Sequence, residues 1–164
     1  MRPTPIKPGP GQESVWAYPR PPRLEKSDKR VQVIFNGVTI ADTHNAYRVL
    51  ETSHPPVYYI PPDDIAMDYL IGTARTTFCE WKGAGAYYTV RVGDQEAANA
   101  AWYYPSPTAD FTPIRNYVAF YPGMMDACYV DGEQVQPQPG GFYGGWVTQD
   151  VVGPFKGEPS TMMW

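Results

Sequence analysis

The sequence predicts an all-β domain that is rich in turns and has little helix. The 19 prolines and 15 glycines make up about a fifth of the 164 residues, where about an eighth is usual, and both residue types interrupt helices. Three pairs of turn residues lie next to apolar runs, as in β-hairpins. Within residues 88–92, apolar side chains alternate with Thr89 and Arg91, which is typical of a sheet with one buried face.

The three turns are predicted because their residues tolerate the positive φ angles of tight hairpins. They are Asn36-Gly37 between residues 31–35 and 38–41, Gly93-Asp94 after residues 88–92, and Asp131-Gly132 between residues 127–130 and 133–135. Two further aromatic runs, 58–61 and 119–122, both end at proline. This repetition hints at two similar half-sheets.

The helix signals are short. Residues 61–70 begin with two prolines and carry acidic residues in what would be the first turn, which favours a short helix. Residues 106–111 place a serine before a proline and predict another. Residues 45–50 are compatible with either a helical turn or a strand.

The two ends of the chain differ in composition from its middle. Residues 1–28 are proline-rich and predict an extended arm, although Trp16 and Tyr18 are too apolar to stay in water and are expected to pack on the body. We therefore predict an arm over residues 1–28, one β domain over residues 29–155 and a tail over residues 156–164.

Charge and composition exclude several classes of function. The net charge is −4, the pI is about 5.1 and the basic residues are scattered, so the footprint of a nucleic-acid partner is missing. No run is apolar enough to span a membrane, and the N-terminus lacks the apolar region of a secretory signal. We expect a cytoplasmic protein whose two cysteines are reduced; the sequence leaves a homo-oligomer open.

Residues 78–88 are the best place to look for a site. Read as one strand, they put Glu80 and Lys82 on the same face, and Gly83 and Gly85 mark a close approach of backbone or ligand. Glu80 is a candidate catalytic carboxylate, and Lys82 a candidate desolvated amine or a charge for an anionic ligand. The alternative is an exposed face with ordinary charges.

His54 is the third candidate catalytic residue. Pro55 and Pro56 follow it and fix the backbone, which suits an imidazole for acid–base work; a histidine bonded to a backbone carbonyl is the alternative. Cys79 is either a nucleophile or ligand contact or a small buried apolar residue. A zinc site would require Cys79, Cys128 and one or both histidines to meet, and we predict no metal.

Aromatic residues suggest the walls of a pocket, with ordinary core packing as the alternative. The candidate ligand-binding rings are Trp81, Trp102, Tyr88 and Tyr59. The chain has no P-loop and no G-x-G-x-x-G, so we predict no cofactor.

Five motifs together resemble the domain of unknown function 427 family: LETSHPPVYYIP at residues 50–61, CEWKG at 79–83, NAAW at 99–102, YVAFYP at 117–122 and GGFYGGW at 140–146. The resemblance runs from about residue 15 to residue 155. It implies two antiparallel sheets packed as an Mss4-like β-tent. Zinc in that wider group is held by paired C-x-x-C motifs, which this chain lacks. The family is also labelled nucleotidyltransferase-like, but the Gly-Ser turn and spaced aspartates of that activity are missing, so we do not carry it over.

Three functions remain open at this point. The first is a small-molecule site, with acid–base catalysis by Glu80, Lys82 and His54. The second is a non-catalytic module whose aromatic cage binds a peptide or a small polar ligand. The third is a zinc- or thiol-dependent site that uses Cys79 with Cys128 or His54.

Overall fold

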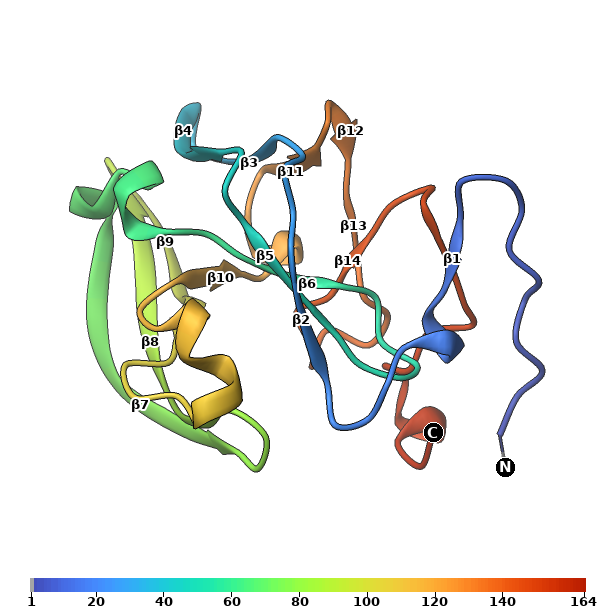
Figure 1. The fold of residues 1–164 in the computed structure, drawn as a ribbon. Helices are drawn as coiled ribbons and strands as arrows, with labels where there is room; N and C mark the ends of the chain where they lie inside the picture. Colours follow the sequence, from blue (N-terminus) through green and yellow to red (C-terminus); the bar gives the residue numbers. More distant parts are fainter. Residues whose placement is uncertain (1) are drawn as a thin grey trace.

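The computed structural model describes residues 2–164, and its regular structure consists mainly of strands joined by loops and short 3₁₀ turns (Figure 1). The prediction of an all-β fold with antiparallel sheets is confirmed. The largest sheet has the order β10-β9-β8-β7, with β7 (Leu70–Cys79), β8 (Gly83–Val92), β9 (Gln95–Tyr103) and β10 (Val118–Phe120). A second four-stranded sheet has the order β12-β11-β3-β4, with β3 (Val31–Phe35), β4 (Val38–Thr43), β11 (Ala127–Val130) and β12 (Glu133–Gln134).

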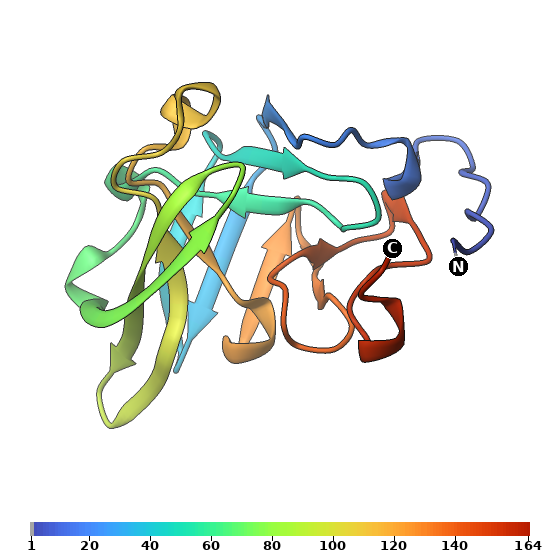
Figure 2. The ribbon, with the colours of Figure 1, turned by 90° about the horizontal axis from the view of Figure 1, so that it is seen from below.

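The structure also contains three smaller sheets. The three-stranded sheet β2-β5-β6 contains β2 (Arg23–Lys26), β5 (Tyr47–Leu50) and β6 (Val57–Tyr59). The two-stranded sheets pair β1 (Glu13–Ser14) with β15 (Val151–Val152) and β13 (Gln136–Pro137) with β14 (Trp146–Val147). The pair β1–β15 is parallel and brings the two ends of the chain side by side; Figure 2 shows both termini at the end of the molecule opposite the largest sheet.

The predicted hairpins are confirmed. Asn36 and Gly37 have φ angles of 46° and 76°, and Asp131 and Gly132 have 47° and 81°. These turns join β3 to β4 and β11 to β12. Gly93, with a φ of 58°, lies in the turn from β8 to β9.

The prediction that residues 78–88 form one strand is wrong, because the chain reverses at residues 80–82 between β7 and β8. Gly83 has a φ of 105°, a conformation that residues with a Cβ rarely adopt. Thr108 holds the turn: its N–H donates to Lys82 O over 3.0 Å and its Oγ1 donates to Trp81 O over 2.6 Å. Glu80 and Lys82 therefore do not share a strand face; Glu80 is exposed and Lys82 is buried.

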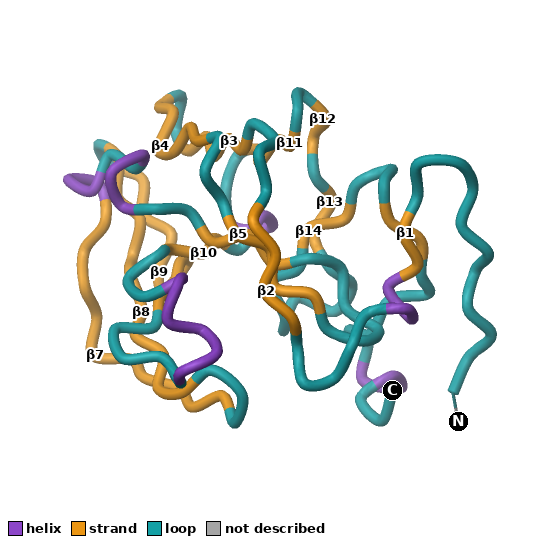
Figure 3. The backbone as a smooth tube through the Cα atoms, viewed as in Figure 1, coloured by secondary structure: helices purple, strands orange, loops and turns teal. Residues whose placement is uncertain are grey.

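The predicted helices are 3₁₀ turns (Figure 3). Residues 61–70 form η2 (Pro62–Asp64) and η3 (Met67–Tyr69), separated because Ile65 is extended and bridges to Ala41. Residues 106–111 overlap η4 (Ala109–Ile114), and residues 45–50 contain strand β5 rather than a helical turn. The remaining 3₁₀ turns are η1 (Val15–Ala17), η5 (Pro122–Met124) and η6 (Pro159–Thr161).

Three groups of buried apolar side chains stabilise these layers. The main core joins the two four-stranded sheets and includes Val33, Val90, Phe120 and Trp146. A second, aromatic cluster lies on the other face of β8 and β9 and is built from Val49, Tyr59, Tyr87, Trp102, Tyr104, Phe111, Ile114 and Ala119. The third cluster anchors the arm.

The third cluster confirms that Trp16 and Tyr18 pack on the body, where they are buried with Leu50 and Val151. The Trp16 Nε1 donates to Pro154 O over 2.9 Å, and the Trp16 ring lies 5.8 Å from that of Trp164. In residues 2–164, no helix has the length and apolar character needed to cross a bilayer.

Candidate functional site

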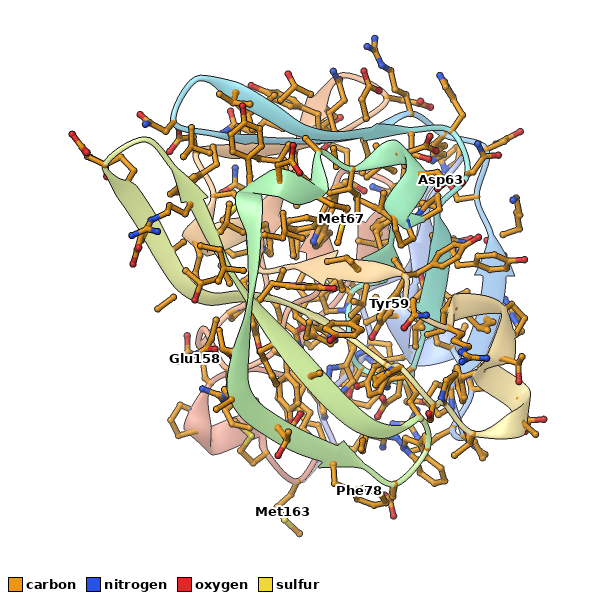
Figure 4. The ribbon with its side chains drawn as sticks, turned by 90° about the vertical axis from the view of Figure 1, so that its left-hand side faces the viewer. Tyr59, Asp63, Met67, Phe78, Glu158 and Met163 are labelled. Atoms are coloured by element: carbon orange, nitrogen blue, oxygen red, sulfur yellow. The ribbon has the colours of Figure 1, made fainter. Side chains whose placement is uncertain are left out.

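A cavity of about 1180 Å³ lies beside the aromatic cluster. One wall comes from β7, the turn at residues 80–82, β8 and β9, and the opposite wall from β5, β6, the loop at residues 137–144 and Lys156. In Figure 4, Tyr59 lies near the centre of the molecule and Phe78 lies at the far tip of the β7–β8 hairpin, where its ring is 78% exposed. The cavity therefore runs from the aromatic interior toward an apolar rim.

Seven of the eight candidate site residues line this one cavity: His54, Tyr59, Cys79, Glu80, Trp81, Lys82 and Trp102. Tyr88 is not brought to it. Its ring stacks on Tyr103 at 4.6 Å and packs against the main core, because it faces the other side of β8 from Tyr87.

The aromatic wall is rigidly built around Trp102. Its Nε1 donates to the Tyr59 hydroxyl over 3.2 Å, and its ring lies 4.6 Å from that of Tyr121. On the opposite side, a Cβ on Gly144 would come within 2.2 Å of the Trp102 ring. Only glycine permits this contact, so the GGFYGGW motif serves to bring the loop's backbone onto the indole.

Gln138 fixes the ring of His54. The Gln138 side chain, 2% exposed, accepts from the Gly145 N–H over 3.1 Å and donates to Lys156 O over 2.7 Å. These two bonds orient the amide, so its Nε2 must also be the donor to His54 Nδ1 at 3.0 Å. The His54 Nδ1 is therefore an acceptor, and the proton is on Nε2, which lies 3.6 Å from the Glu51 carboxylate.

The surroundings keep this imidazole neutral. Burial, together with the positive charges of Lys156, Arg20 and Lys82, lowers the pKa of His54 to about 3. A ring with this pKa carries no charge at neutral pH and is a weak base. The acid–base role predicted for His54 therefore lacks the pKa near 7 that it needs. Glu80, the predicted acid partner, is exposed rather than buried.

Three cations line the cavity, and their positions relative to the rings differ. The Lys82 Nζ lies 5.8 Å from the ring centres of both Tyr104 and Phe111, the Lys156 Nζ 5.6 Å from that of Tyr143, and the Arg75 Cζ 4.8 Å from that of Tyr87. Each of these three cations therefore lies within the distance of a cation–π contact. Burial and the positive charge of Arg20 lower the pKa of Lys156, and the negative charge of Glu51 offsets only part of this change.

Lys82 is the unusual member of the set. It is 8% exposed, and within residues 2–164 no carboxylate forms an ion pair with it. Glu51, one of the two acids on the cavity wall, forms an ion pair with Arg20, whose Nε lies 3.3 Å from the Glu51 Oε2. A lysine that is mostly buried and lacks an ion-pair partner carries a charge that a bound anion could neutralise.

The cysteines do not meet. Cys79 is half-buried on the cavity wall, whereas Cys128 is 1% exposed in the main core, where burial raises the pKa of its thiol to about 12. In the part of the chain that the structure describes, no three His, Cys, Asp or Glu side chains are grouped to hold a metal ion. The geometry therefore rules out a site that pairs Cys79 with Cys128, whereas Cys79 and His54 line the same cavity.

Sequence reasoning missed Gln138, Gly144, Arg75 and Lys156, which line the same cavity. Gln138 carried a usable signal, because Pro137 and Pro139 flank it and fix its backbone much as two prolines fix that of His54. No local pattern distinguishes Lys156 from the other lysines.

The fold and the cavity define an all-β protein with an aromatic-walled pocket. The chain belongs to the family described as Domain of unknown function (DUF427), whose model matches residues 23–131, and this confirms the resemblance found from the motifs. The comparison with curated proteins gave no match. His54, Lys82 and Trp102 lie within the matched range, whereas Gln138 and Lys156 lie beyond it.

Proposed function

We propose that the protein binds a small organic molecule in the cavity beside Trp102. The observation that carries this proposal is the Lys82 side chain, which is 8% exposed and has no ion-pair partner within residues 2–164, on the wall of an aromatic-lined cavity of about 1180 Å³. Ligand pockets are typically apolar and aromatic, with a few fixed polar groups and a volume of roughly 300–1,000 Å³. Lys82, His54 and Gln138 are such fixed polar groups.

Binding without catalysis fits the geometry better than acid–base chemistry. The pKa of His54, lowered to about 3, makes its ring a weak base near pH 7, and Glu80 is exposed. The cavity also differs from a cage for a cationic ligand, since Lys82, Lys156 and Arg75 would repel such a ligand.

The test is a fragment screen read by the indole N–H signals of the protein in NMR spectra. Trp81 and Trp102 line the cavity, while Trp16 and Trp146 are buried elsewhere and act as internal controls. We expect fragments that bind to shift the signals of Trp81 and Trp102 only. The Trp102→Phe variant should lose most of this binding while Trp164→Phe keeps it, because Trp164 packs at the opposite end against Trp16. Hits that leave both cavity indoles unmoved would contradict the proposal.

A further inference from the structure

The sign of charge in the cavity is opposite to that of the whole protein. The chain has a net charge of −4, yet the cavity is lined by three cations, Arg75, Lys82 and Lys156, and by two acids. One of these acids, Glu51, is paired with Arg20, and the other, Glu80, is exposed. The interior of the cavity is therefore positive, since screening by water acts most on the exposed group.

Lys82 and Lys156 act on the same region of the cavity. Both lower the pKa of His54, together with Arg20, so their charges reach the imidazole from the two opposite walls. Lys82 comes from the β7–β8 turn, and Lys156 follows β15 near the end of the chain. An anion bound between the two walls would be attracted by both ammonium groups.

Three polar groups at this place, those of Lys82, Lys156 and His54, are donors. The Lys82 and Lys156 ammonium groups are donors only, and the neutral His54 carries its proton on Nε2 because Gln138 donates to Nδ1. Oxygen atoms with negative charge are the acceptors that such donors bind best. The rings of Trp102, Tyr59 and Tyr104 next to them provide a surface for a flat apolar body.

We propose that the ligand is an aromatic organic acid whose oxyanion head, a carboxylate or a phosphate, binds Lys82 while its ring lies against the Trp102 wall. This inference rests on the proposed function and narrows it to one class of ligand. Lys156 is the second cation for the head group, and a phosphate, with more charge than a carboxylate, gains more from it.

The experiment compares four probes with the same ring and different head groups. They are 2-naphthoate, 2-naphthyl phosphate, the neutral 2-naphthamide and the cationic 2-naphthylmethylamine, each titrated at millimolar concentration while the Trp81 and Trp102 indole signals are followed. We expect the two acids to bind about ten-fold or more tightly than the amide, because one charge-assisted hydrogen bond is lost with the amide. The cation should bind most weakly, and added salt should weaken only the acids.

Two variants and one control assign the head-group site. Lys82→Met keeps the length and apolar character of the side chain and should weaken both acids about ten-fold while leaving the amide unchanged. Lys156→Met should weaken the phosphate more than the carboxylate. Lys7→Met removes the same charge from an exposed position outside the cavity and should change nothing. Equal losses for the two acids would mean that Lys156 is not the second cation for the head group.

The outcomes separate this inference from the proposed function. If the amide binds as tightly as the acids, or if Lys82→Met does not change the affinity for the acids, the anion class is wrong and the cavity is still a binding site. If the cationic 2-naphthylmethylamine binds more tightly than the acids, the anion class is likewise wrong and the cavity is still a binding site. If none of the four probes shifts the Trp81 and Trp102 signals, both proposals are overturned.

Discussion

The side chain of Gln138 donates a hydrogen bond to the Nδ1 of His54 over 3.0 Å, across 84 residues of sequence. The same amide bonds Gly145 and Lys156. One side chain thus connects the His54-Pro55-Pro56 segment to the glycine-rich loop and to the C-terminal segment. Because every polar atom of this amide is used, the neutral form of His54 is built into the fold.

The first prediction concerns the pH dependence of stability. The pKa of His54 falls from 6.5 to about 3 on folding, so between these values the unfolded chain binds a proton that the folded chain does not. The free energy of unfolding must then fall as the pH falls, by at most about 1.4 kcal/mol per pH unit from this group. His54→Asn, whose amide oxygen replaces the acceptor for Gln138, should flatten the slope measured by urea unfolding between about pH 7 and pH 5.

His44 supplies the matched control. It is exposed in a turn, and only its Nδ1 approaches a backbone oxygen, that of Asp28 at 3.1 Å. His44→Asn should leave the slope as it is in the unmodified protein. Equal slopes for His54→Asn and the unmodified protein would mean that His54 titrates normally in the folded state.

The second prediction concerns the contact between Gly144 and Trp102. A Cβ at residue 144 would lie 2.2 Å from the indole ring, so Gly144→Ala must displace either the ring or the loop. We expect a loss of about 1–3 kcal/mol in the free energy of unfolding, as for other overpacked sites, together with a shift of the Trp102 indole signal. Gly72→Ala, where nothing lies within 4 Å of the added Cβ, should cost little. A stable Gly144→Ala variant with an unmoved Trp102 signal would show that the loop is not pressed against the ring.

The sequence predicts local features of this fold well because the turns are determined locally. Asn36-Gly37 and Asp131-Gly132 adopt positive φ angles whatever surrounds them, so the hairpins follow from the residues alone. The turn at residues 80–82 was missed for a related reason. Its only conformational signal is Gly83, and a single glycine in an aromatic run indicates a bulge or a close approach as readily as a reversal.

The sequence predicted which residues belong to the candidate site, but not how they are arranged in space. The residue types alone single out His54, Lys82 and Trp102, which do line one cavity. Which charge is buried depends on the turn, so the sequence did not distinguish the buried Lys82 from the exposed Glu80. Gln138 and Lys156 reach the cavity through long-range pairings such as β13 with β14, and periodicity within a segment carries no information on such contacts.

The third prediction uses the two cysteines as reporters. Cys79 is half-buried on the cavity wall, while Cys128 is buried and burial raises the pKa of its thiol to about 12. Because the thiolate is the reactive form, iodoacetamide should modify Cys79 in the folded protein and Cys128 only after unfolding. Mass spectrometry of peptides from native and urea-unfolded samples measures this. The Cys79→Ser variant should not react when folded, and modification of Cys128 in that variant would show that the main core opens.

The fourth prediction is that Lys82 lowers stability. Its side chain is mostly buried and has no carboxylate partner within residues 2–164, and replacing buried charge by an apolar group of similar size is often neutral or stabilising by about 1–4 kcal/mol. Lys82→Met should therefore leave the free energy of unfolding unchanged or raise it. The control is Lys29→Met, which breaks the half-exposed ion pair between Lys29 and Asp150 at 2.7 Å and should lower stability by about 0–1 kcal/mol. Urea unfolding of the three proteins side by side measures both effects. If Lys82→Met proves clearly less stable than Lys29→Met, the ammonium has a structural role in the fold. A gain in stability together with a loss of acid binding instead identifies a charge that the fold tolerates for the sake of a ligand.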